Sequence, residues 1–551
     1  MANGFAVLPD LLHPVPTPRI DFEQTRLAIT LAFAGDGAGG LFSEALERAS
    51  HPYSTWDPAG FEKDLFLHRF VAQGLKIQIG RHEPVAVTSH LTRLLAHPPA
   101  DVAVIHYRRA VLAELSAAPE LRRELEQLYL SLVRFRGLLE NASGARNWDA
   151  NRRQLDLLSL IKEIVDRMSS GFASARSGLS RLAAFGASVQ ASEPYRSLSD
   201  LLSYDARLAS VSLQVAVGAD GQIRGFDIVG VKEARENAFV NPRWRRFLSK
   251  VELFVRGYRF SDAEVMARLI DAVFSGFEGE IASFVQLFGD LEFYLGALGF
   301  QDRARAAGLE VCLPELVAPN VPRTFEGLFN PLLLMSGVTP VPCDLRTSRL
   351  ATTVLVTGPN SGGKTRLLQS LGLTQLLAQS GLFIPARSGA VALAPGLVMS
   401  LIEETRADQS EGRLGMELMR IRDLFERLPP GAMVLLDELC SGTNPSEGEE
   451  IFELVVGMLS RLEPQAFITT HFLQFAARLE REQKIPNLGF LQVELGVDRR
   501  PTYQFTPGVA ATSLAGHAAE RLGVTGDQLL ALIERNIRKQ KASSAQLAGQ
   551  L

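Results

Sequence analysis

The feature that most constrains this chain is a glycine-rich loop between an apolar run and a helical pattern. Residues 352–357 read TTVLVT, residues 358–365 read GPNSGGKT, and Leu367, Leu368 and Leu371 follow at helical spacing. A β-branched apolar run predicts a strand, so the order is strand, loop, helix. Successive backbone N–H groups of such a loop, with the positive end of the helix, surround phosphate oxygens. The segment therefore predicts a phosphate-binding P-loop in an α/β domain.

Each side chain type in this loop has a physical role in binding a nucleotide. Gly358 and Gly363 permit backbone angles and a close approach that other residues do not. Lys364 is expected to reach the β and γ phosphates, and Thr365 to give its hydroxyl to Mg²⁺. The predicted cofactors are ATP and Mg²⁺, and the predicted cofactor-binding residues of the loop are Gly358, Pro359, Asn360, Ser361, Gly362, Gly363, Lys364 and Thr365.

Two further strands are predicted to end in polar side chains. Residues 432–436 form an apolar run that ends at Asp437 and Glu438, and residues 466–470 form another that ends at His471. Ligands of parallel sheets sit at the carboxyl ends of the strands. Asp437 is expected to hold the magnesium shell, and Glu438 to orient or polarise the attacking water. The predicted metal ligands are thus Thr365 and Asp437, and the predicted catalytic residues are Glu438, His471 and Lys364.

Upstream of residue 300 the pattern is mainly helical. Two apolar stripes at helical spacing, the first after Pro119, predict an antiparallel pair of long helices. Alternation between residues 211 and 217 and a return strand from Ile223 predict a small hairpin. Prolines between residues 311 and 345 mark extended structure at the start of the α/β domain. The stripes comprise Leu121, Leu125, Leu128, Leu132, Phe135 and Leu139, then Leu157, Ile161, Ile164 and Met168.

Composition and charge exclude several classes of protein. Apolar residues make up 46% and charged residues 21% of the chain, as in globular proteins. The net charge of −4 argues against a highly basic coat for nucleic acid, although a local basic stripe is compatible with it. Three cysteines without a CxxC pair fit a reducing compartment. We found no signal peptide and no stretch near the roughly 18 apolar residues of a membrane span, so the predicted location is cytoplasmic.

Four segments resemble motifs of the MutS family of DNA-repair ATPases. They are TGPNSGGKT at residues 357–365, LLAQSGLFIPA at 376–386, DELCSGTNPSEG at 437–448 and TTHF at 469–472. The resemblance implies an ABC-type, MutS-like P-loop NTPase domain, homodimerisation through that domain, and DNA as a partner. Gln379, in the second segment, joins the expected nucleotide-binding residues. Asn330 and Cys343 stand where the family usually has histidine and asparagine.

A further resemblance covers the helical half. Residues 105–128 resemble the helical core of the family, whose lever helices carry a DNA-gripping clamp. It implies that the hairpin belongs to a clamp-like insertion near residues 205–250. Basic residues in that insertion, Arg243, Arg245, Arg246 and Lys250 beside Trp244, are then candidate contacts to a nucleic-acid backbone, with a solvated helix face as the alternative.

The expected organisation has four parts and departs from the family in two ways. The parts are an N-terminal helical region (1–100), core and lever helices with the insertion (101–300), the ATPase domain (301–540) and a tail (541–551). The segment DQSEGRLGME at residues 408–417 differs from the family's serine-containing signature, with Ser410 as its nearest equivalent. The chain is also expected to lack the mismatch-recognition and nuclease domains.

Three functions stay open from the sequence. The first is an ATPase that controls its grip on branched or duplex DNA in repair or recombination, acting beside a separate nuclease or repair partner. The second is a ribosome-associated ATPase, suggested by the wording GTNPSEG. The third is a slow ATP switch that grips a protein partner, suggested by the altered signature.

Overall fold

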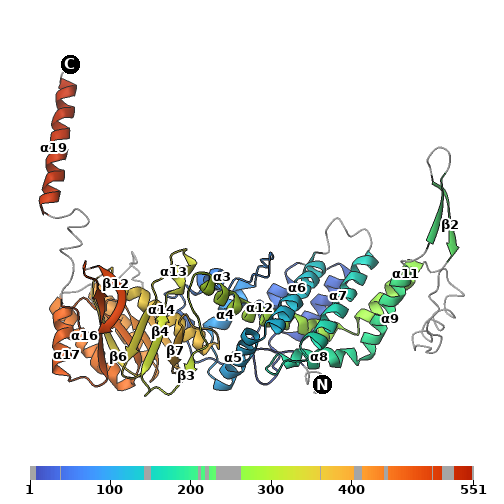
Figure 1. The fold of residues 1–551 in the computed structure, drawn as a ribbon, viewed down its shortest axis with the longest axis horizontal. Coiled ribbons are helices and arrows are strands. Elements are labelled where there is room, and N and C mark those ends of the chain that lie inside the picture. The colour runs from blue at the N-terminus through green and yellow to red at the C-terminus, as the bar shows by residue number, and fades with distance from the viewer. Residues whose placement is uncertain are drawn as a thin grey trace. The chain divides into compact units, whose positions relative to one another are not determined.

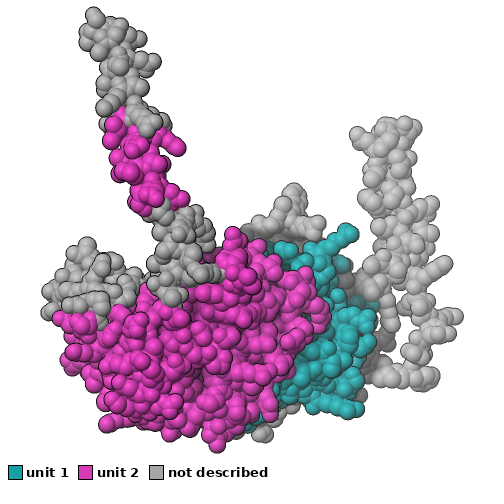
Figure 2. Space-filling view, turned by 60° about the vertical axis from the view of Figure 1, so that its left-hand side comes forward, with its two compact units in different colours: residues 1–52, 75–94, 101–300 teal, residues 53–74, 95–100, 301–551 magenta. Residues whose placement is uncertain are grey.

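The computed structural model describes residues 8–36, 39–141, 150–208, 212–217, 223–230, 262–359, 361–401, 413–439, 445–498, 500–511 and 526–548. The chain divides into two compact units (Figure 2). Unit 1 comprises Met1–Pro52, Leu75–Leu94 and Asp101–Phe300, and unit 2 comprises Tyr53–Gly74, Leu95–Ala100 and Gln301–Leu551. The four-part boundaries stay predictions.

Unit 1 is built mainly from helices (Figure 1), and the last residues of two of them, 95–96 and 301–306, belong to unit 2. Their bounds are α1 (Phe22–Ala34), α2 (Leu41–Glu47), α4 (Thr88–Ala96), α5 (Val102–Ala117), α6 (Pro119–Glu140), α7 (Ala150–Gly171), α8 (Ser180–Gln190), α9 (Glu193–Leu208), α11 (Asp262–Phe274) and α12 (Glu278–Ala306).

The predicted pair of long helices is confirmed as α6 and α7. Pro119 occupies the first turn of α6, where its missing N–H costs no hydrogen bond. Both apolar stripes are buried. Arg167 near the end of α7 pairs with Glu124 near the start of α6 at 3.0 Å, so the two helices run antiparallel.

The predicted hairpin is present as β1 (Ser212–Val217) and β2 (Ile223–Gly230), which pair antiparallel. Its predicted turn and the candidate nucleic-acid contacts Arg243, Arg245, Arg246 and Lys250 lie outside the described residues. Their role therefore stays a prediction.

One expectation about membrane spans is corrected. Among the helices in the described residues, α12 is long and apolar enough to cross a membrane by length and composition. The apolar stretch of α12 is completely buried in the structure. The side chains of Asp290 and Glu292, two acidic residues of α12, are buried as well. A core helix passes the same test, so α12 is weak evidence for a membrane span.

Unit 2 is a mixed α/β domain. Its elements are η1 (Pro58–Gly60), α3 (Leu67–Gly74), β3 (Glu315–Leu316), β4 (Arg323–Leu328), α13 (Pro331–Met335), β5 (Cys343–Thr347), β6 (Thr353–Thr357), α14 (Lys364–Gln379), β7 (Ser388–Val391), β8 (Leu397–Ser400), α15 (Arg413–Arg427), β9 (Met433–Leu436), α16 (Pro445–Leu459), η2 (Ser460–Leu462), β10 (Gln465–Thr469), α17 (Leu473–Glu482), β11 (Leu488–Leu495), β12 (Pro501–Pro507) and α19 (Gly526–Ala548).

Two sheets organise this unit. The larger has the order β12-β11-β6-β10-β9-β8, in which only β12 pairs antiparallel with its neighbour. Its central strands β6, β10 and β9 are buried along their whole length, as parallel strands covered on both faces are. The smaller sheet has the order β3-β7-β4-β5. The predicted α/β domain preceded by helices is therefore confirmed at the level of a mixed α/β architecture.

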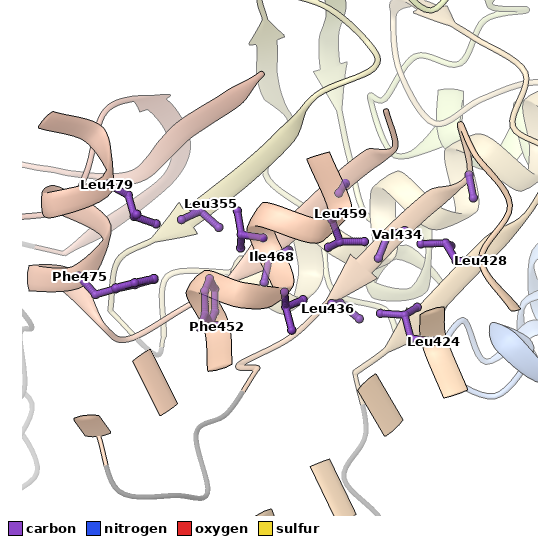
Figure 3. Packing of buried hydrophobic residues seen from close by; sticks show 14 residues of the cluster. Leu355, Leu424, Leu428, Val434, Leu436, Phe452, Leu459, Ile468, Phe475 and Leu479 are labelled. Atoms are coloured by element: carbon purple, nitrogen blue, oxygen red, sulfur yellow. The ribbon is translucent and has the colours of Figure 1, made fainter. Parts of the chain in front are cut away.

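An apolar cluster joins the central strands to three helices (Figure 3). Leu355, Val434 and Ile468 project from β6, β9 and β10, and Phe452 and Phe475 meet them from α16 and α17. The rings of Phe452 and Phe475 pack edge to face with centroids 5.4 Å apart. This packing holds the three strands in register and so fixes where their carboxyl ends lie.

Candidate functional site

Three predicted strands end at the same edge of the larger sheet, and polar residues follow them there. β10 pairs in parallel with β6 on one side and with β9 on the other. The residues that follow these strands are Gly358 after β6, Asp437 after β9 and Thr470 after β10. The structure thus brings together the groups that the sequence assigned to one site.

The glycine loop (residues 358–363) leaves no space for side chains at two positions. Gly358 has φ +138°, and a Cβ there would lie 2.7 Å from Cγ2 of Val493. A Cβ at Gly362 would lie 2.8 Å from the same atom. Gly363 has φ +85° and forms the N-terminal cap of α14. Glycine at these positions thus lets the backbone pack closely at the N-terminus of α14, where N–H groups and the helix dipole favour an anion.

Other predicted loop residues frame this backbone. Pro359 is half-buried and Ser361 is exposed, while Asn360 lies outside the described residues. At the base of the loop, the Thr357 hydroxyl accepts a hydrogen bond from the Ala510 amide at 2.9 Å. This contact ties the loop's base to the chain that follows β12.

Lys364 bends its side chain back over the loop. Its Nζ donates to the carbonyl oxygens of Gly358 at 2.9 Å and Pro359 at 3.1 Å, and the residue is 3% exposed. Burial lowers the pKa of the ammonium group, and the carboxylates of Glu438 and Asp437 oppose that shift. The result is a sheltered positive charge beside the glycine loop.

A hydroxyl and a carboxylate meet where a divalent cation is expected. The Thr365 hydroxyl donates to Oδ2 of Asp437 at 2.6 Å, and the Thr469 hydroxyl donates to Oδ1. The Thr469 oxygen also accepts the Glu438 amide at 2.9 Å. Hard oxygen ligands of this kind fit Mg²⁺, which is bound by one or two carboxylates together with water and substrate phosphates.

Glu438 and His471 form a pair beside this carboxylate. Nε2 of His471 lies 2.5 Å from Oε1 of Glu438, and their side chains are 34% and 38% exposed. Glu438 has φ +54°, a left-handed conformation that non-glycine residues adopt at a cost and that clusters at functional sites. The bend turns its carboxylate toward the imidazole and leaves both groups open to a ligand.

Gln379 does not belong to this site, so its assignment is corrected. It lies 14 positions after Thr365 on α14, roughly 21 Å along the axis at 1.5 Å per residue. Its amide is buried and exchanges hydrogen bonds with the backbone of Ala394 at 3.0 and 3.1 Å. The physical role of Gln379 is to attach the helix to the chain between β7 and β8.

Tyr503 was not predicted as a site residue, yet it lies against the loop. It belongs to β12, is 46% exposed and has φ +61°. Its Cδ1 lies 3.2 Å from where a Cβ on Gly363 would stand. No local pattern could have placed it, because β12 reaches the loop only through the pairing of β11 with both β12 and β6.

The arrangement as a whole suits a polyphosphate with a divalent cation. Loop amides and a lysine ammonium supply positive charge, a threonine and an aspartate supply hard oxygen ligands, and a glutamate with a histidine stands beside them. An exposed tyrosine ring adjoins the loop. These groups can bind phosphates, hold a cation and orient a water molecule.

Comparisons with known proteins match the part of the chain that contains these residues. Residues 354–535 match the family model for MutS domain V. The chain is 31% identical over 238 residues to Endonuclease MutS2 of Thermomicrobium roseum. The aligned region covers 41% of this chain and 29% of that relative. The chain is also 32% identical over 240 residues to Endonuclease MutS2 of Streptococcus mutans, covering 43% and 29%. The chain thus matches less than a third of the length of these relatives.

Proposed function

From the premise that this chain belongs to the MutS family through its C-terminal domain, we propose that unit 2 is a P-loop ATPase that binds and hydrolyses MgATP. The observation that carries the proposal is the meeting of the glycine loop, the Thr365–Asp437 contact and the Glu438–His471 pair at one sheet edge. In a phosphoryl-transfer site, catalysis is mainly positioning and charge stabilisation, which these groups supply.

The residues divide the work of hydrolysis among them. The loop amides and Lys364 bind the β and γ phosphates, while Thr365 and Asp437 would hold Mg²⁺, whose charge would offset that of the phosphates. Glu438 orients the attacking water, and His471 holds that carboxylate in place. Water attacks the γ phosphorus, the bond to the bridging oxygen breaks, and ADP and inorganic phosphate leave. The Tyr503 ring takes the nucleoside end by stacking on the base.

Homodimerisation is part of the proposal. Helix α19 exposes large apolar side chains, namely Leu529, Leu530, Leu532, Ile533 and Ile537, which are between 43% and 57% exposed. An exposed apolar face of this kind marks an interaction site. A second copy of the chain is the occupant that fits a symmetric ATPase assembly.

DNA is the proposed partner whose binding the ATPase cycle controls, in repair or recombination. Support comes from the family and from the name endonuclease carried by the relatives, which states a nucleic-acid substrate for those proteins. We do not assign endonuclease activity to this chain, because the matched region is 29% of each of these two relatives. Binding through phosphate contacts should weaken steeply as salt rises. The cytoplasm is the proposed location.

The decisive experiment is the rate of ATP hydrolysis by the purified chain with duplex, branched and single-stranded DNA, and with none. The Glu438→Gln variant serves as the blank. Stimulation by one form of DNA supports the proposal and identifies the structure gripped. A hydrolysis rate that no form of DNA changes would favour a ribosomal or a protein partner instead. Sedimentation with ribosomes distinguishes these two alternatives. No hydrolysis above the blank would overturn the ATPase itself.

A further inference from the structure

Glu438 adopts a backbone conformation that needs a contact to hold it. Its φ of +54° lies in the left-handed region, which is unfavourable for a non-glycine residue and persists only where the surrounding structure fixes it. The residue directly before it still follows the sheet, because the Asp437 amide donates to the Ser400 carbonyl of β8 at 3.0 Å. The chain therefore leaves the sheet at Glu438 itself, and it does so in a strained conformation.

Thr469, the last residue of β10, supplies such a contact. Its hydroxyl oxygen accepts the Glu438 amide at 2.9 Å, and its hydroxyl hydrogen is donated to Oδ1 of Asp437. A threonine hydroxyl has one hydrogen to donate and can accept as well, so both bonds form at once. Hydrogen bonds that share one hydroxyl polarise and so strengthen each other. The expected cation ligand and the expected water-orienting residue are thus joined through one side chain.

The position of Thr469 is fixed by its surroundings. The residue is fully buried, and the next amide along the chain, that of Thr470, still donates to a carbonyl of β6 at 3.1 Å. Ile468, directly before it, pairs with Leu436 of β9, and both belong to the apolar cluster (Figure 3). The Thr469 hydroxyl therefore stands at a defined place beside the end of β9.

Two residues from the end of β10 hold Glu438, one at its backbone and one at its side chain. Thr469 binds the amide, and Nε2 of His471 lies 2.5 Å from Oε1 of the carboxylate. The side chains of Glu438 and His471 are partly exposed, whereas Thr469 is buried. A hydrogen bond is stronger in the interior than in water, so we expect the contact at the amide to set the backbone conformation.

We propose that Thr469 is a positioning residue for hydrolysis, because its hydroxyl keeps Glu438 in the left-handed conformation that directs the carboxylate to the attacking water. The inference rests on the proposed ATPase. Phosphoryl transfer depends mainly on positioning, and a displacement of about 1 Å can cost about 10²-fold in rate. Thr469 acts through Glu438 and Asp437, not by contact with the nucleotide.

Thr469→Val tests this, because valine keeps the β-branched shape and removes the hydroxyl. Single-turnover hydrolysis of ATP should be about 10²-fold slower than in the wild type. The affinity for a non-hydrolysable ATP analogue with Mg²⁺, measured by calorimetry, should stay within a few-fold, since the substitution removes no group assigned to the phosphates or the cation. Thr469→Ser keeps the hydroxyl and should recover most of the rate.

Hydrogen exchange at the Glu438 amide reports on the contact in the absence of ATP. The Thr469 oxygen is the acceptor of this amide, so the amide should exchange faster in Thr469→Val than in the wild type. Thr469→Ser should stay close to the wild type. Mass spectrometry of peptides that cover residues 433–439 of the full-length protein measures the exchange. Equal exchange in Thr469→Val and the wild type would show that the hydroxyl does not hold the amide, and would overturn the proposal.

Thr353→Val is the matched control. Thr353 is a buried threonine at the start of the central strand β6, at the end away from the glycine loop. Among the described residues its hydroxyl has no hydrogen-bond partner. Hydrolysis and exchange at Glu438 should therefore match the wild type in this variant. If Thr469→Val does not fold, Thr469→Ala replaces it with the same expected results.

The outcomes distinguish the two proposals. Slow hydrolysis in Thr469→Val, with retained affinity and with recovery in Thr469→Ser, supports the inference. Hydrolysis at the wild-type rate in Thr469→Val, or an equal loss of rate in both variants, overturns it and leaves the ATPase standing. A loss of analogue affinity as large as the loss of rate has the same meaning, because Thr469 would then support binding and not positioning. Absence of wild-type hydrolysis above the Glu438→Gln blank overturns both proposals.

Discussion

The Thr365 hydroxyl donates a 2.6 Å hydrogen bond to Oδ2 of Asp437, 72 residues later in the chain. Thr365 follows β6 and Asp437 follows β9, and β10 lies between these strands in the sheet. Thr469 at the end of β10 fills the gap by donating to Oδ1 of the same carboxylate. The proposed cation site is thus a consequence of strand order, because Asp437 and Thr469 stand at the ends of two strands and Thr365 lies in the first turn of the helix that follows the third.

Asp437→Asn should raise the Mg²⁺ concentration needed for half-maximal ATP hydrolysis by about ten-fold or more, the equivalent of losing one charged interaction of 1.5–3 kcal/mol. Asparagine keeps an oxygen near Thr365 but removes the negative charge that attracts the cation. A magnesium titration of the rate measures this. Asp423→Asn on α15 is the control, and an unchanged titration in Asp437→Asn would remove Asp437 from the cation site.

Lys364→Ala should weaken ATP binding by roughly 10- to 100-fold, because it deletes the charge that meets the phosphates. Burial lowers the pKa of Lys364, so the wild-type affinity should begin to fall at a pH below the ordinary lysine value of about 10.4. Calorimetry across alkaline pH measures both effects. The residual affinity of the variant should lack this fall, and an identical pH profile in both proteins would contradict the assignment.

Glu438→Gln should bind ATP within a few-fold of the wild-type affinity yet hydrolyse it about 10²- to 10⁴-fold more slowly, the range of a general-base contribution. Glutamine retains an oxygen for the contact with His471 but cannot polarise water as a carboxylate does. Single-turnover phosphate release is the measurement. Hydrolysis at the wild-type rate would place the catalytic base elsewhere.

The strands of the site could be predicted from sequence because each is a short apolar run with a chemical signature at its end. TTVLVT precedes the glycines, and the run before Asp437 has no polar interruption. Their order in space could not be predicted in the same way. Strand β10 lies between β6 and β9, which are both distant from it in the sequence. The hydrophobic periodicity of a strand does not indicate which strands pair with it.

Two features that the sequence did not place have the same physical origin. Gln379 lies in a motif-like segment, but sequence spacing alone did not show that a helix carries it away from the phosphates. Residues 53–74 carry no signal of the unit they pack against, because a helix's apolar face looks the same in the sequence whichever unit covers it. The predicted N-terminal helical region therefore gave no hint that part of it belongs to unit 2.

Tyr503→Ala should weaken ATP binding by about 1–3 kcal/mol, the usual loss for one base stacked on an aromatic ring. Binding of inorganic tripolyphosphate should stay the same, since the ring is assigned to the nucleoside end and the loop amides to the phosphates. Competition titrations with the two ligands measure the difference. Tyr503→Phe should behave as the wild type, and an equal loss for both ligands would show that Tyr503 supports the loop instead.

The buried carboxylate of Glu292 should make the protein's stability depend on pH. It accepts the Val87 amide at 2.9 Å and the Tyr129 hydroxyl at 3.0 Å, and burial raises its pKa from 4.5 to about 7. Between these values the folded chain holds a proton that the unfolded chain has lost. The free energy of unfolding should therefore fall as pH rises from about 4.5 to 7, then level off. Burial raises the pKa of Asp290 to about 7 as well, so it adds a fall of the same sign.

Glu292→Gln should remove the Glu292 share of this dependence and stabilise the protein at pH 8 by at most roughly 3 kcal/mol, the equivalent of moving a pKa from 4.5 to about 7. The amide preserves hydrogen bonding to Val87 and Tyr129 without a buried charge. Calorimetric unfolding temperatures between pH 4.5 and 8 measure the effect, with the exposed Glu120→Gln as control. A steeper loss of stability with pH in Glu292→Gln than in the wild type would show that Glu292 is ionised in the folded protein and stabilised by its neighbours.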